Sequence, residues 1–205
     1  MRKQAKPMLV VLSSPSGGGK TVLARMLLKK HSEFKRSISF TTREKRKGEK
    51  EGADYHFVSR KDFQKKIKEH EFAEWALVFG NYYGTPKENI QKAEGKIEVI
   101  LLVLDVQGGL TLKRRYPDSV LIFILPPSVE ELEKRLSRRG TDKPQVIRKR
   151  LKAALKEITF CREYDYIVVN RKLEDTVKLL EEIIIAEKHK VKRTGLEVSL
   201  VKKSN

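Results

Sequence analysis

One stretch of small residues constrains the fold of this chain more than any other feature. Residues 13–21 read SSPSGGGKT, directly after the apolar run 8–12 and directly before the apolar-rich segment 22–28. The glycines let backbone N–H groups turn toward phosphate oxygens, and a helix N-terminus adds partial positive charge. Lys20 can reach the outer phosphates, and the Thr21 hydroxyl can hold a magnesium ion. The order strand, loop, helix therefore predicts a P-loop that binds a nucleoside triphosphate.

Position 14 departs from the usual P-loop pattern, because the glycine expected six residues before the lysine is Ser14 here. Serine is acceptable at this position unless the backbone needs a positive φ. The alternative is a flexible Gly-Ser loop, but both flanking elements are those that phosphate binding requires. We therefore assign the triphosphate to Ser14, Pro15, Ser16, Gly17, Gly18, Gly19, Lys20, Thr21 and Val22.

The rest of the chain alternates between apolar strands and amphipathic helices. Runs at 97–104, 120–125 and 166–169 are typical of buried parallel strands, and helices are expected at 86–94, 130–138, 145–160 and 173–188. The predicted inward stripes are Ile147, Leu151, Ala154, Leu155 and Ile158, then Val177, Leu180, Ile184 and Ile185. A chain of 205 residues suits one α/β domain with insertions.

The net charge and the cysteine content indicate which kinds of partner and which cellular compartment to expect. The chain has 45 basic and 27 acidic side chains and a formal net charge of +18, which favours anionic partners without choosing among them. Its single cysteine, Cys161, excludes an intramolecular disulfide and makes a reducing compartment the default. The apolar runs are far shorter than the roughly 20 residues of a membrane helix. We expect a cytoplasmic protein with no membrane partner and no specific nucleic-acid partner.

A second group of motifs follows the P-loop in order. Residues 39–49 read SFTTREKRKGE, and DY, FAEW and GNYYGT follow at 54–55, 72–75 and 80–85. Later come LDVQG at 104–108, PPS at 126–128, RLSRRGT at 135–141, RL at 150–151 and VVN at 168–170. These ordered blocks strongly resemble guanylate kinases over about residues 8 to 188.

The resemblance implies an α/β P-loop fold: a three-layer sandwich with a mostly parallel core sheet, an inserted GMP-binding subdomain and a helical lid. Residues 1–189 would form one guanylate-kinase-like domain. Its core would be 7–37, 96–130 and 153–189, its GMP-binding insertion 38–95 and its lid 131–152. Residues 190–205 would be a poorly ordered basic tail, either a functional arm or an inert extension.

The resemblance also implies which residues bind GMP: Ser39, Arg43, Arg46, Tyr55, Glu74, Tyr83, Thr85 and Asp105. Arginine forks suit a phosphate monoester, although a solvated basic loop is the alternative and the one we prefer for Lys45 and Lys47. The Glu74 carboxylate can accept from guanine N1–H and the exocyclic amine, which adenine cannot match; alone, Glu74 would more often be a surface residue. Thr85, where the family commonly has serine, could donate to guanine O6.

Catalysis would rest on cations. The resemblance places Arg135, Arg139 and Arg150 in the lid, so that the expected catalytic residues are these three with Lys20 and Arg43. Thr21 and Asp105 are the expected Mg²⁺ residues, while Val103 replaces an acid that many family members carry. Asn170 would lie near the adenine, with a turn asparagine as an equal alternative.

The predicted reaction is transfer of the γ-phosphoryl group of MgATP to GMP, giving ADP and GDP. A phosphate monoester is mostly dianionic at neutral pH, so no general base is needed. One alternative is a catalytically silent guanylate-kinase-like binding module, which Ser14 and Val103 would favour. Others are a nucleic-acid-binding protein, from the net charge, and a kinase for another phosphorylated acceptor.

Overall fold

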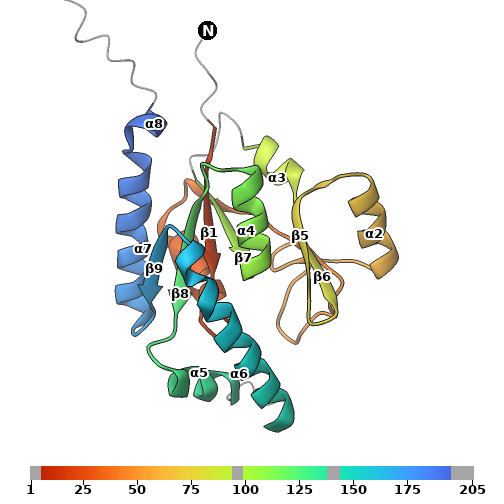
Figure 1. Ribbon diagram of the computed structural model, residues 1–205. Helices are drawn as coiled ribbons and strands as arrows, with labels where there is room; N and C mark the ends of the chain where they lie inside the picture. Colours follow the sequence, from red (N-terminus) through yellow and green to blue (C-terminus); the bar gives the residue numbers. More distant parts are fainter. Residues whose placement is uncertain (1–5, 94–98, 138–143, 195–205) are drawn as a thin grey trace, which may run out of the picture.

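The computed structural model describes residues 6–93, 99–137 and 144–194 (Figure 1). A five-stranded sheet forms its centre, in the order β2-β7-β1-β8-β9, and every pairing in it is parallel. The strands are β1 (Met8–Ser13), β2 (Phe34–Arg36), β7 (Val99–Leu104), β8 (Val120–Leu125) and β9 (Tyr166–Val169). The predicted α/β fold with a mostly parallel core sheet is confirmed.

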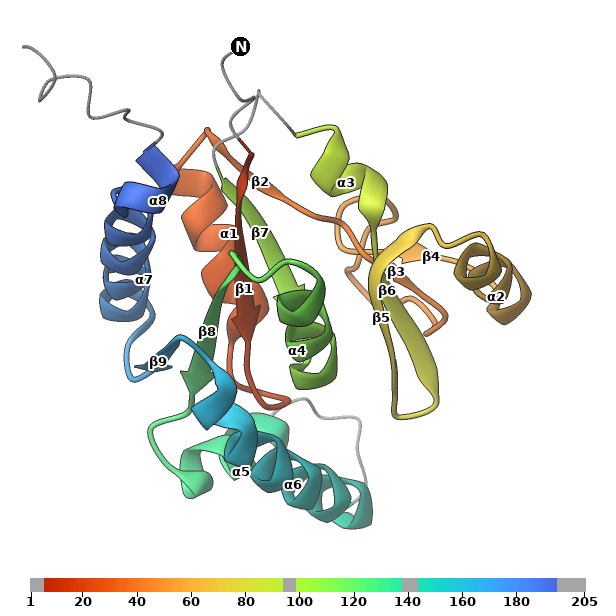
Figure 2. The same ribbon diagram turned by 45° about the horizontal axis from the view of Figure 1, so that its top comes forward.

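Helices cover both faces of this sheet, which explains why its inner strands β7 and β8 are apolar at every position. On one face, α1 (Lys20–Lys30) and α7 (Leu173–Lys188) pack against alternate residues of β1, such as Val10 and Leu12. On the other face, α4 (Val106–Arg115) packs against Leu9 and Val11. Figure 2 shows these layers with β1 between them.

A second sheet stands beside the first (Figures 1 and 2). Its order is β4-β3-β6-β5, with strands β3 (Phe40–Thr41), β4 (His56–Phe57), β5 (Phe72–Val78) and β6 (Asn81–Pro86). The helix α2 (Arg60–Lys68) covers it through Phe63, whose ring stacks on Phe72 and Tyr82 at 4.5 and 5.2 Å. The short helix α3 (Lys87–Gln91) leads back toward the first sheet.

Two helices lie across the end of the first sheet at which its strands finish (Figure 2). They are α5 (Val129–Ser137) and α6 (Pro144–Ile158), and they pack through Leu132, Leu136 and Ala154. The hydroxyl of Ser128 accepts from the N–H of Glu131 at 3.2 Å and caps the N-terminus of α5. A 3₁₀ helix (Thr159–Glu163) continues α6 toward β9.

Several local expectations differ from the structure. The helix predicted to end near 160 changes to 3₁₀ geometry after Ile158. Leu155 and Ile185, predicted to face inward, are 42% and 49% exposed. Each follows a buried residue, and a step of one residue turns a side chain by about 100° on a helix, beyond the narrow stripe that these helices bury.

The C-terminal segment contains one further element, α8 (Val191–Thr194), which follows α7. Its Lys192 reaches Asp118 at 3.1 Å, and its Arg193 lies 3.5 Å from Glu187. The rest of the predicted tail, from 195, lies outside the described residues. None of the helices in the described ranges is long and apolar enough to span a membrane.

Candidate active site

The loop between β1 and α1 has the conformation that the P-loop motif predicts. Gly17 and Gly19 have φ angles of 94° and 95°, which L side chains rarely adopt. Ser14 is not one of the positive-φ residues, so serine is accepted there without backbone strain. Its side chain instead fills nearby space, because a Cβ on Gly18 would lie 2.6 Å from the Cβ of Ser14. The serine thus makes position 18 dependent on glycine.

Asn170 is buried behind this loop, directly after β9. Its side-chain amide donates to the carbonyl of Gly18 at 3.0 Å and accepts from the hydroxyl of Thr176, on α7, at 3.2 Å. The Asn170 side chain therefore ties the P-loop to the end of the sheet and to α7. Its predicted contact with adenine stays a prediction.

A cavity of about 260 Å³ opens in front of the P-loop. The P-loop with the first turn of α1, the second sheet and α6 all contribute to its wall. The predicted site residues that line it are Ser14, Ser16, Gly17, Gly18, Gly19, Lys20, Thr21, Val22, Ser39, Arg46, Tyr55, Glu74, Tyr83, Asp105 and Arg150.

Other predicted site residues do not line this cavity or fall outside the described residues. Pro15, Arg43, Thr85, Arg135 and Asn170 are described but are not part of the lining. Arg139 falls in 138–143, outside the described residues. The cavity therefore unites the predicted triphosphate loop with most of the predicted GMP residues, and the roles of all of them stay predictions.

Glu74 on β5 lies in the wall of this cavity with only 2% of its surface exposed. The N–H and the hydroxyl of Thr85 both donate to its Oε1, at 3.0 and 2.6 Å. Burial, with a smaller effect from the charge of Asp105, raises the pKa of Glu74 to about 7. Thr85 therefore orients the Glu74 carboxylate, while its predicted contact with guanine O6 stays a prediction.

Besides Glu74, the part of the cavity wall that includes the second sheet carries hydroxyl groups and an arginine. The rings of Tyr55 and Tyr83 meet edge to face at 5.9 Å, and Arg46 lines the cavity beside them. Arg43 instead makes a two-pronged ion pair with Glu49, at 2.8 and 3.1 Å. Glu49 also accepts from the N–H of Arg46 at 2.8 Å. A carboxylate thus already holds Arg43 in a geometry that suits a phosphate.

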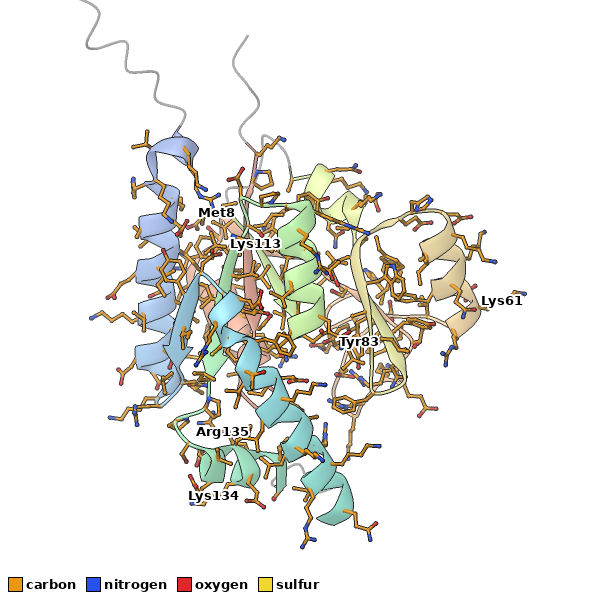
Figure 3. All side chains as sticks on the ribbon, viewed as in Figure 1. Met8, Lys61, Tyr83, Lys113, Lys134 and Arg135 are labelled. Carbon is orange, nitrogen blue, oxygen red and sulfur yellow. The ribbon has the colours of Figure 1, made fainter. Side chains whose placement is uncertain are left out.

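The two helices below the sheet supply the remaining charges. Arg150 on α6 lines the cavity, whereas Arg135 on α5 donates to Glu131 at 2.8 Å and to the Asn170 carbonyl at 3.3 Å. Figure 3 shows Arg135 below the central sheet and Tyr83 on the second sheet.

The sequence interpretation missed Glu157 on α6. It lines the cavity together with Ser16 and Lys20. Burial raises its pKa against the opposing charge of Lys20. An acid on the inward side of an amphipathic helix, three residues after Ala154, was the available signal.

Thr21 and Asp105 fit a magnesium site that is completed by a ligand. Asp105 caps α4, with its Oδ1 accepting from the N–H groups of Gln107 at 2.8 Å and Gly108 at 3.1 Å, and it shares the cavity with Thr21. In the described part of the chain no group of three or more His, Cys, Asp or Glu side chains could hold a metal. Mg²⁺ is usually bound through one or two protein ligands, waters and substrate phosphates, so this small donor set suits it.

The fold and the site together define a class of protein. The P-loop shares one cavity with a buried carboxylate and with a second sheet that is basic and rich in hydroxyl groups. This arrangement is typical of a P-loop nucleotide kinase.

Comparison with known proteins makes this class specific. A family model described as guanylate kinase matches residues 6–187. Guanylate kinase from Carboxydothermus hydrogenoformans is 47% identical over 195 residues, 95% of this chain and 96% of that protein. Guanylate kinase from Myxococcus xanthus is 46% identical over 190 residues, 92% and 91% of the two chains. The crystal structure of guanylate kinase from Anaplasma phagocytophilum superposes with a TM-score of 0.78 at 38% identity and covers 98% of each chain. The chain belongs to the guanylate kinase family.

Proposed function

We propose that this chain catalyses the reaction MgATP + GMP → ADP + GDP in the cavity between the P-loop, the second sheet and α6. The observation that carries this proposal is the position of Glu74. It is a buried carboxylate on the second sheet that lines the same cavity as Lys20 and Thr21 of the P-loop. A guanine-selective group and a triphosphate site therefore share one space.

On this assignment the second sheet binds GMP. Glu74 accepts from guanine N1–H and the exocyclic amine, and a site with such paired polar groups can reject a mismatched base by up to about 10⁴ to 10⁵ in favourable cases. Arg46, Ser39, Tyr55 and Tyr83 bind the phosphate, joined by Arg43, which Glu49 orients. The base then lies deep against α4 and the phosphate faces the P-loop.

The P-loop and α6 bind the triphosphate. Lys20, whose Nζ donates to the carbonyl of Ser14 at 3.3 Å, is placed to reach the outer phosphates. Arg150, and Arg135 and Arg139 from the predicted lid, approach the transferring group as 131–152 closes over the core. We propose the same division into a core, a GMP-binding insertion at 38–95 and a lid at 131–152. The helix α6 extends from the proposed lid into the core, because it continues past residue 152 to Ile158.

The chemistry needs charge neutralisation rather than a base. Two unit charges about 4 Å apart repel by about 1 kcal/mol in water and by several times more in a drier site. Lys20 and the arginines offset this repulsion, and alignment of the reactants can contribute roughly 7 to 11 kcal/mol. Thr21 and Asp105 would hold Mg²⁺, which supplies charge neutralisation at the phosphates when it is bound. We place the reaction in the cytoplasm.

The test is ADP formation by the purified protein with MgATP and each of GMP, AMP, CMP and UMP. Turnover should require GMP and should be lost in Lys20→Ala, with an unchanged thermal transition as the control for folding. Glu74→Ala should raise the KM for GMP and weaken discrimination against AMP. Binding of GMP without turnover in the wild type would instead indicate the silent binding module, and Ser14 and Val103 would then be the first positions to revert.

A further inference from the structure

The turn between β5 and β6 contains an unusual residue, Phe79. Val78 pairs with Asn81, so the hairpin loop consists of only Phe79 and Gly80. These residues have φ angles of 48° and 80°. Two successive positive φ angles define the type I′ turn, whose preferred pair is Asn-Gly. Phenylalanine in the first position is a strained choice for this turn, because a bulky side chain disfavours the left-handed region.

The environment of Phe79 does not account for this strain. Its side chain is 56% exposed, and none of the aromatic pairs among the described residues includes it. A residue that mainly stabilised the fold would be packed. Strained backbone positions are concentrated at functional sites.

The location of Phe79 suggests what it does. Phe79 and Val78 line the cavity from the tip of the hairpin, while Arg150 lines it from α6. A large apolar ring thus stands at the hairpin end of the wall that would bind GMP. Arg150 comes from the helix that belongs to the predicted lid, and guanidinium groups pack well on aromatic rings.

We propose that Phe79 is a positioning residue for phosphoryl transfer: its ring packs on α6 around Arg150 when the second sheet and α6 close over bound GMP and ATP. This inference rests on the proposed function. Closure buries the exposed ring, excludes water from the phosphates, and sets the side chain of Arg150 beside the transferring group. The left-handed turn places the ring in the cavity wall; an Asn-Gly turn would have the same left-handed backbone but no ring.

The test separates strain from function with Phe79→Asn, which creates the preferred turn pair. Its Tm should be about 2 °C higher than that of the wild type, because the substitution relieves backbone strain in a chain of this size. An unchanged Tm is also compatible with the proposal. Its kcat/KM for GMP should fall by about tenfold, with most of the loss in kcat, because closure and not the first binding step is impaired. Phe79→Tyr, which keeps the ring, should retain wild-type kinetics.

His70 provides a matched control. It is also a non-glycine residue with positive φ, 54°, and it is exposed at the end of α2, away from the cavity lining. His70→Asn should raise the Tm in the same way and leave the kinetics unchanged. Wild-type kinetics in Phe79→Asn, or an equal loss in Phe79→Tyr, would overturn the proposal. A clear fall in the Tm of Phe79→Asn would show that the ring stabilises the fold and would also overturn it.

A binding measurement keeps this test separate from the proposed function. GMP with a non-hydrolysable ATP analogue should raise the Tm of the wild type more than the sum of the two ligands alone, and this cooperative increment should be lost in Phe79→Asn. If the wild type shows no GMP-dependent turnover, the proposed function fails, but the increment still reports closure. An unchanged increment in Phe79→Asn would refute the role of the ring in closure.

Discussion

The environment of Glu74 sets a pH dependence for GMP binding that follows from its pKa. Burial raises that pKa from 4.5 to about 7. Guanine offers donors, so it binds the ionised carboxylate. With a pKa of about 7, about one protein molecule in ten has an ionised Glu74 at pH 6, and about nine in ten at pH 8. The affinity for GMP should therefore rise about tenfold from pH 6 to pH 8 through this group.

The stability of the free protein should change in the opposite direction. The pKa of Glu74 is higher in the folded than in the unfolded state, so its contribution favours folding below about pH 4.5 and is lost as the pH rises through 7. Between pH 6 and pH 8 the loss is about 1.4 kcal/mol, or roughly 4 °C in Tm. Glu74→Gln cannot ionise and still offers Thr85 an acceptor, so this part of the pH dependence should vanish.

The assay must separate Glu74 from the phosphate of GMP, which has its own pKa of about 6. Glu74→Gln keeps the phosphate effect and loses the guanine effect, and guanosine does the reverse. Binding can be followed by the fluorescence of Trp75, the single tryptophan of the chain and the sequence neighbour of Glu74. Equal pH slopes for GMP binding in the wild type and in Glu74→Gln would refute this reasoning.

Three further substitutions test the surroundings of the site. Gly18→Ala should raise the KM for ATP, because its Cβ would lie 2.6 Å from the Cβ of Ser14; adding Ser14→Gly should restore part of the loss, and an additive double variant would contradict this contact. Asn170→Asp removes the donor to the Gly18 carbonyl, so urea unfolding should show a loss of about 1 to 3 kcal/mol together with a higher KM for ATP; an unchanged midpoint would argue against this tie. Glu49→Gln should raise the KM for GMP several-fold with little change in kcat, since Glu49 orients Arg43 and the 43–49 loop; a lower KM would show that Glu49 acts as a competitor.

Much of the fold can be predicted from local patterns in the sequence. The strands β7 and β8 are apolar at every position because helices cover both faces, and this property distinguishes buried parallel strands from half-exposed ones. The P-loop can be predicted equally well, because its glycines, lysine and threonine each have a separate physical role in phosphate binding. Helix surfaces were harder: Leu155 and Ile185 are exposed because periodicity does not reveal how wide a buried stripe is.

The fine structure of the site depends on pairings between distant elements, which no local pattern shows. Asn170 and Gly18 are 152 positions apart, so the tie between them depends on the order of strands in the sheet. The approach of Glu157 to the P-loop depends likewise on how α6 crosses the end of that sheet. The strain at Phe79 requires the register of the hairpin, which fixes a two-residue loop. The sequence identifies the chemistry of each wall but not the contacts across it.

Two contacts in the site without substrate share one feature, a carboxylate placed beside a cation. Glu49 engages Arg43 through two hydrogen bonds, and Glu157 lies near Lys20. In both places a carboxylate stands beside a cation that the proposed reaction assigns to phosphate. These carboxylates hold the cations in position before the substrate arrives, so the cations need not be gathered from solvent. Such preorganisation lowers the reorganisation needed at the moment of transfer. It also explains why a chain of net charge +18 forms a site of alternating charges rather than a uniformly basic surface.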